Sequence, residues 1–147
     1  MKRVVITGMG AITPLGNNVS DYWNGLINGI SGAGPITRFD ASKFKTRFAC
    51  EVKGFDPLDY LEKPEARKCD LYTQFSIAAS DQAIKQADIN FDTVNKDRIG
   101  VIWGSGNGGM ETFQEGVVEF AKGEGTPRFN PFFMPKMLIL KVLINLV

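Results

Sequence analysis

Two short runs of β-branched and apolar residues, each ending at glycine, stand out along the chain. Residues 2–7 (KRVVIT) lead into Gly8, and residues 98–104 (RIGVIWG) lead into a second glycine-rich stretch. Apolar runs of this length, bounded by turn residues, are typical of strands buried on both faces of a sheet. We therefore expect a buried strand at each of these two positions.

Helical spacing of apolar residues follows each expected strand. Residues 20–30 predict a helix that Ser20 would cap, and residues 64–87 predict a well-buried helix with a broad face of small and apolar side chains. Residues 110–121 predict an amphipathic helix. The order of strand, glycine turn and helix, used twice, predicts an α/β fold.

Weaker signals lie between these elements. Residues 44–52 suggest an irregular strand or one arm of a hairpin, and residues 57–61 suggest a short helical turn. Pro127, Pro131 and Pro135 predict a loop. Residues 137–147 (MLILKVLINLV) hold no acid, glycine or proline, which fits a core helix, and the stretch is too short to span a membrane.

Bulk composition narrows the class of protein. The 147 residues fit one ordinary domain, and 17 Lys+Arg against 16 Asp+Glu give a net charge of +1. Such a chain has no global field to gather nucleic acid or an anionic membrane, so neither is an expected partner. Two cysteines without a CxxC motif give no disulfide framework, and no signal-peptide core follows the start. We expect a cytoplasmic protein.

The chain contains no histidine. Imidazole is the usual general base near neutral pH and the commonest metal ligand, so the residues present cannot form a Ser-His or Cys-His pair or most zinc sites. We predict no metal site and no cofactor.

One glycine motif admits a different function. Gly104-x-Gly106-x-x-Gly109 has the spacing of a dinucleotide-binding loop. That fingerprint also needs a second strand ending in an acid about 20 residues on, and here a proline loop occupies that place. A nucleotide-binding domain is therefore the least favoured alternative, and packing is the better explanation of these glycines.

Six stretches in a fixed order carry a resemblance to one family. The chain resembles the elongating type II β-ketoacyl-acyl-carrier-protein synthases, which belong to the thiolase-like superfamily. The resemblance spans residues 3–136 and rests on residues 3–16 (RVVITGMGAITPLG), Trp23 with Ser31-Gly32, residues 38–40 (RFD), 67–70 (RKCD), 104–109 (GSGNGG) and 130–135 (NPFFMP).

This resemblance implies the N-terminal part of a thiolase-like α-β-α-β-α layered fold, incomplete in this chain. It also implies an acyltransferase of fatty-acid biosynthesis, a homodimer, that condenses malonyl-acyl-carrier-protein (malonyl-ACP) with an acyl thioester by decarboxylation. In the family, a cysteine nucleophile and two histidines beyond the last matching stretch perform this reaction. Neither Cys50 nor Cys69 matches the nucleophile, and a small buried or semi-buried residue is the simpler interpretation of each. We therefore expect the 147-residue chain to be catalytically inactive and to have no catalytic residue of its own.

Six residues fall at or beside positions of secondary importance in the family. Arg67 and Lys68 match a basic patch that docks the acidic carrier protein in the family, and we expect Lys63 beside it, although a solvated helix face is the alternative. Phe132 and Phe133 match a loop near the acyl pocket, where plain core packing is the alternative. Asn107 stands where relatives place an apolar pocket residue, which leaves the acyl chain length open.

The end of the chain departs from the family. We expect residues 1–136 to form the N-terminal part of the synthase domain. Residues 137–147 have no resemblance, which suggests a shifted reading frame or a truncation. A non-catalytic subunit that binds the carrier protein or serves as a dimerisation partner is the alternative function.

Overall fold

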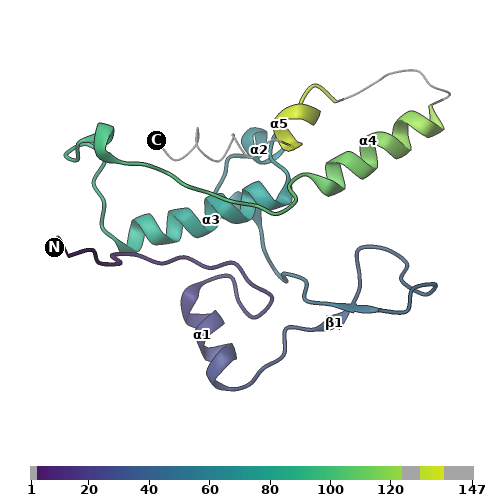
Figure 1. Ribbon diagram of the computed structural model, residues 1–147, viewed down its shortest axis with the longest axis horizontal. Helices are drawn as coiled ribbons and strands as arrows, with labels where there is room; N and C mark the ends of the chain where they lie inside the picture. The colour runs from purple at the N-terminus through teal and green to yellow at the C-terminus, as the bar shows by residue number, and fades with distance from the viewer. Residues whose placement is uncertain (1–2, 124–129, 138–147) are drawn as a thin grey trace.

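The structure is a computed structural model that describes residues 3–123 and 130–137 (Figure 1). Its elements, in chain order, are α1 (Val19–Ile27), β1 (Gly34–Pro35), β2 (Phe48–Ala49), the 3₁₀ turn η1 (Pro57–Asp59), α2 (Lys63–Ala66), α3 (Leu71–Gln86), the 3₁₀ turn η2 (Lys96–Arg98), α4 (Met110–Lys122) and α5 (Phe133–Met137). Helices joined to a small sheet make a partial α/β architecture.

Helix α3 is the centre of the described fold. It is 16 residues long, about 24 Å at the usual rise, and the other elements are arranged around it (Figure 1). Thr73, Ser76, Ile77 and Ala78 are its buried residues. The small side chains allow neighbouring backbone to approach closely. The helix predicted over residues 64–87 is confirmed from Leu71 onward, but residues 67–70 interrupt it and separate the short helix α2 from α3.

The N-terminal segment runs along α3 (Figure 1). Gly8 and Gly10 lie so close to the helix that an added Cβ would stand 2.0 Å from the carbonyl oxygen of Ala83 and 1.8 Å from that of Ala79. Any larger residue at either position would force the segment off the helix. These two glycines therefore serve packing.

Two glutamines of α3 hold this segment by its backbone. Gln86 accepts a hydrogen bond from the amide of Met9 (2.6 Å), and Gln82 accepts one from the amide of Ala11 (3.1 Å). The amide nitrogen of Gln82 also donates to the carbonyl of Asn17 (2.8 Å) and to the hydroxyl of Tyr60 (3.1 Å). Gln82 thus joins the N-terminal segment, at two points, and Tyr60 to one helix.

The segment before α3 forms the predicted helix and hairpin with small changes. Helix α1 begins two residues earlier than expected, because Asn18 rather than Ser20 accepts the capping bond from the amide of Asp21 (2.8 Å). Strand β2 lies within the expected arm at residues 44–52 and pairs antiparallel with β1. The helical turn expected at residues 57–61 is η1, and the rings of Phe55 and Phe75 pack edge to face beside it.

The two buried strands expected at residues 2–7 and 98–104 are wrong for this chain. Neither segment is a strand where it is described, and Val4, Ile6 and Ile102 are 93%, 83% and 98% exposed. A strand needs a neighbouring strand to take its backbone hydrogen bonds, and the sheet within residues 3–123 and 130–137 contains β1 and β2 alone. The apolar pattern is present, but these residues do not supply the sheet that would bury it.

The C-terminal elements include the predicted amphipathic helix. Helix α4 covers the expected residues, and α5 packs across it, with the ring of Phe133 against Gly116. Pro135, expected in a loop, lies inside α5. A proline is tolerated there because the first turn of a helix has no amide partner to lose. Pro127 and the apolar stretch, apart from Met137, lie outside the described residues.

Candidate functional site

Four of the six candidate residues fall in two places near the start of α3. One is a basic surface, here defined as Lys63, Arg67 and Lys68, on and just after α2. The other is the glycine loop, residues 104–109, which ends at the start of α4. Figure 1 shows α2, α5 and the starts of α3 and α4 gathered near the middle of the view.

Sequence and packing fix α2 in place. Pro64 stands in its first turn, where a proline is favoured because its missing N–H has no partner in a helix. The side-chain amide of Gln74 on α3 donates to the carbonyl of Ala66 (3.0 Å) and to that of Cys69 (3.3 Å). Ala66 and Cys69 are buried. The basic surface is therefore carried on a short helix attached to the central one.

The three cations differ in their surroundings. Lys63 and Arg67 are exposed, whereas the side chain of Lys68 is 34% exposed and forms an ion pair with Glu65, three residues earlier. The structure thus brings the three predicted docking residues onto one segment and gives one of them an acidic partner.

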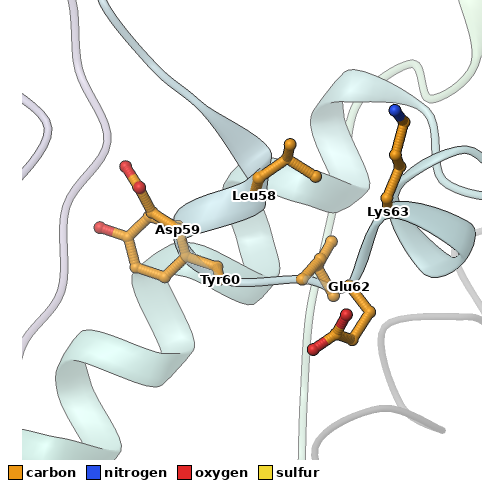
Figure 2. A pocket seen from close by; sticks show the side chains of 6 residues that line it. Leu58, Asp59, Tyr60, Glu62 and Lys63 are labelled. Atoms are coloured by element: carbon orange, nitrogen blue, oxygen red, sulfur yellow. The ribbon is translucent and has the colours of Figure 1, made fainter.

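A shallow hollow of about 460 Å³ lies beside the basic surface. Its lining residues come from η1 and the start of α2: Leu58, Asp59, Tyr60, Leu61, Glu62 and Lys63. Figure 2 shows the ammonium group of Lys63 and the carboxylate of Glu62 directed to opposite sides. The hollow combines two leucines and a tyrosine with charges of both signs.

The glycine loop is packed at its end and open at its start. An added Cβ on Gly108 would stand 2.8 Å from Cζ of Tyr72, and one on Gly109 would stand 2.7 Å from Cα of Met137. Gly109 also has a φ of +66° and precedes α4, a conformation that favours glycine. Gly104 and Gly106 would meet nothing within 4 Å. Packing therefore accounts for the last two glycines of the loop.

Asn107 lies exposed in this loop, and the two phenylalanines lie farther along. Phe133 packs on Gly116, about 9 Å along α4 from Met110, and Phe132 is 39% exposed. The structure places Phe133 in the α4–α5 contact and Asn107 at the other end of that contact. Asn107 and Phe133 therefore both lie next to α4.

A second hollow, of about 330 Å³, lies between the starts of α3 and α4. Arg38 and Glu111 form an ion pair at its edge, with Nη1 and Oε2 3.1 Å apart. Glu51, also in the lining, accepts bonds from the hydroxyl (2.6 Å) and the amide (3.1 Å) of Thr37. The hydroxyl bond, the larger cause, and the amide bond hold the pKa of Glu51 below its usual value.

Asp70 and Thr112 join the starts of α3 and α4, and no sequence pattern predicts this pair. Asp70 is 9% exposed, and its carboxylate accepts a hydrogen bond from the hydroxyl of Thr112. The nearby hydroxyl of Tyr72 is buried and has no hydrogen-bond partner among the described residues. The sequence pattern predicts that an aspartate before a helix caps that helix. A bond from Asp70 to a distant helix therefore cannot be predicted from the sequence.

The two cysteines differ in burial. Cys69 is buried, as expected, and lies in the turn between α2 and α3. Cys50 is exposed, so its expected burial is wrong. No group of three or more potential metal ligands occurs within the described residues, and no helix there is long and apolar enough to cross a membrane.

Comparison with known proteins decides the family. The profile described as "Beta-ketoacyl synthase, N-terminal domain" matches residues 1–140. The chain belongs to the β-ketoacyl synthase family. Two relatives, each named 3-oxoacyl-[acyl-carrier-protein] synthase 2, come from Synechocystis (45% identical) and Staphylococcus aureus strain COL (42%). Each match covers 93% of this chain and 33% of the relative, so the chain spans about a third of their length.

Solved structures support the same family and its fold. The ishigamide ketosynthase/chain length factor matches with a TM-score of 0.77 and 27% identity, over 97% of this chain and 35% of the other. A type II polyketide ketosynthase in complex with its acyl-carrier protein matches with a TM-score of 0.77 and 25% identity, over 99% and 38%. The chain has the N-terminal part of the thiolase-like ketosynthase fold, as the sequence predicted.

Proposed function

We propose that this chain is the N-terminal third of an elongating condensing enzyme of the 3-oxoacyl-ACP synthase II type. The observation that carries the proposal is the 45% identity over 137 residues to the Synechocystis synthase. The reaction is decarboxylative condensation of malonyl-ACP with an acyl thioester in fatty-acid elongation. The intact enzyme is a cytoplasmic homodimer.

The chemistry sets what the rest of the enzyme must supply. A cysteine thiolate displaces the carrier thiol from an acyl thioester and holds the acyl group. Malonyl-ACP loses CO₂, and the resulting enolate attacks the acyl carbonyl as the thiolate leaves. Two histidines would stabilise the enolate oxygen, and this chain has no histidine. The 147 residues alone are therefore catalytically inactive in this proposal.

In the proposed enzyme, this chain docks the carrier protein and borders the acyl pocket. Lys63, Arg67 and Lys68 contact acidic groups of the carrier protein. Asn107, in the loop before α4, borders the acyl pocket, together with Phe132 and Phe133 near α5. Residues 1–136 belong to the synthase domain, and residues 137–147 depart from it.

A chimera tests the proposal. Residues 1–137 of this chain would replace the matching third of the Synechocystis synthase, and the product would be incubated with acyl-ACP and malonyl-ACP. We expect 3-oxoacyl-ACP from the chimera and none from the 147-residue chain purified free of host synthase. A chimera that melts like the parent enzyme yet makes no product would contradict the proposal, and turnover by the chain alone would overturn its inactivity.

A non-catalytic carrier-binding partner is the second candidate. The similarity to the solved ishigamide ketosynthase/chain length factor supports this alternative. In this alternative the chain would bind the carrier protein or a dimerisation partner without itself condensing. Addition of the separate chain to a purified ketosynthase distinguishes the two, because only a partner subunit would change the length of the product made.

A further inference from the structure

An acidic residue, Glu65, lies next to the basic surface and pairs with one of its cations. The ammonium group of Lys68 is paired with a carboxylate oxygen of Glu65, on the preceding turn of the same segment. The side chains are 34% and 40% exposed, so each can still be reached from solvent. A carboxylate or phosphate that arrives at Lys68 therefore meets a site already occupied by an anion.

The charge of the whole segment is small for the same reason. Residues 62–68 hold three cations, Lys63, Arg67 and Lys68, and two acids, Glu62 and Glu65, so the net charge is +1. Figure 2 shows the carboxylate of Glu62 turned away from the ammonium of Lys63, which leaves Glu65 as the acid paired with a docking cation.

We propose that Glu65 limits the affinity of carrier-protein docking by competing for Lys68. This inference rests on the proposed function of the basic surface. When the acidic carrier binds, Lys68 exchanges the carboxylate of Glu65 for one on the carrier, and Glu65 remains nearby as a like charge. Weak docking suits a carrier that has to leave after each transfer.

The size of the effect follows from the exposure of the pair. Partly exposed ion pairs are individually weak and are screened by salt. Replacing Glu65 by glutamine keeps the shape of the side chain and removes one acid next to the site. We expect the variant to bind the carrier about two- to fivefold more tightly at low salt.

The chain offers a matched control. Asp81 and Lys85 on α3 form a second ion pair within one helix, with Nζ and Oδ2 2.7 Å apart. Asp81→Asn changes the net charge as Glu65→Gln does and also releases a lysine from an acid. A general charge effect would tighten binding equally in both variants.

The experiment measures the dissociation constant of the Synechocystis acyl carrier protein on the 147-residue chain, immobilised at low density to prevent self-association. We expect tighter binding by Glu65→Gln than by Asp81→Asn, and a difference that disappears in a Lys68→Met background. Helix content by circular dichroism is compared among all variants.

Each outcome bears on one proposal. Equal binding by the two acid variants, or a gain that persists without Lys68, overturns the role of Glu65. If Lys68→Met and Arg67→Gln leave binding unchanged, the docking function itself fails, which is a separate result. A Glu65→Gln variant with lower helix content and weaker binding would make Glu65 a structural residue and would also overturn the inference.

Discussion

The hydroxyl of Thr112, in the first turn of α4, donates a hydrogen bond to the carboxylate of Asp70, the residue that precedes α3. Asp70 stands at the N-cap of α3, yet its side chain makes no capping bond to that helix. The carboxylate serves the contact between two helices instead. Because Asp70 follows Lys68 and Cys69 directly, this contact also connects the basic surface to the start of α4.

The first prediction tests this contact. Thr112→Val keeps the shape of the side chain but removes the donor, so a buried carboxylate loses its partner. Hydrogen bonds to charged groups contribute about 1.5–3 kcal/mol, so amides of α4 should exchange hydrogen roughly tenfold faster or more.

Thr93→Val is the matched control. The hydroxyl of Thr93 bonds the carbonyl of Asn90 (3.2 Å) at an exposed site, so its loss should change exchange little. Equal exchange of the α4 amides in the two valine variants would show that the bond to Asp70 contributes nothing to holding α4.

The second prediction concerns the end of the glycine loop. In Gly108→Ala the new methyl group would stand 2.8 Å from the ring of Tyr72, so the ring or the loop has to move. Overpacking of this kind typically costs about 1–3 kcal/mol. We expect a lower urea midpoint and a shift in the ring signals of Tyr72 by NMR.

Gly106→Ala provides the control two residues earlier. A Cβ there meets nothing within 4 Å, so the variant should stay within about 0.5 kcal/mol of the parent. A Gly108→Ala variant as stable as Gly106→Ala, with unchanged Tyr72 signals, would refute the packing role of Gly108.

Local patterns predicted the helices, because spacing and caps lie within one segment. Apolar periodicity predicts helices α3 and α4, and Pro57 predicts the turn at η1. The strands did not follow, since the apolar run around Ile102 needs neighbouring strands to be buried. The site shows the same division. The resemblance to the family points to Lys63, Arg67 and Lys68, which lie within one short segment, whereas Asp70 and Thr112 are 42 positions apart and meet only in the fold.

The third prediction is a pH dependence at Glu51. Its folded-state pKa lies below the ordinary value of 4.5, so the contribution to stability is present above that value and is lost as the pH falls through the folded pKa. Thr37→Val removes the hydroxyl donor, the larger cause, and should raise the pKa of Glu51 toward 4.5, as measured by NMR titration of its carboxyl carbon.

Asp40 is the internal control for this titration. Its pKa is also lowered, by bonds from the backbone and then the hydroxyl of Ser42, and neither involves Thr37. The pKa of Asp40 should therefore stay where it is in Thr37→Val. An unchanged pKa of Glu51 in the same titration would show that the Thr37 hydroxyl is not what lowers it.

The last prediction tests docking through the basic surface. Neutralising Arg67 and Lys68 together, by Arg67→Gln and Lys68→Met, should weaken binding of an acidic acyl carrier protein by about tenfold or less, because exposed ion pairs contribute only about 0–1 kcal/mol each. Added salt should weaken parent binding and should affect the double variant less, since charges at the surface are screened over about 10 Å at 0.1 M salt.

The control for this test is a second pair of cations with the same features. Lys85 is ion-paired with Asp81, as Lys68 is with Glu65, and Arg98 is exposed, as Arg67 is. Arg98→Gln with Lys85→Met therefore removes the same two charges from another part of the surface. If net charge alone governed binding, the two double variants would bind alike and have the same salt dependence. Specific docking requires that only the Arg67 and Lys68 variant loses affinity, because only those charges lie where the carrier makes contact.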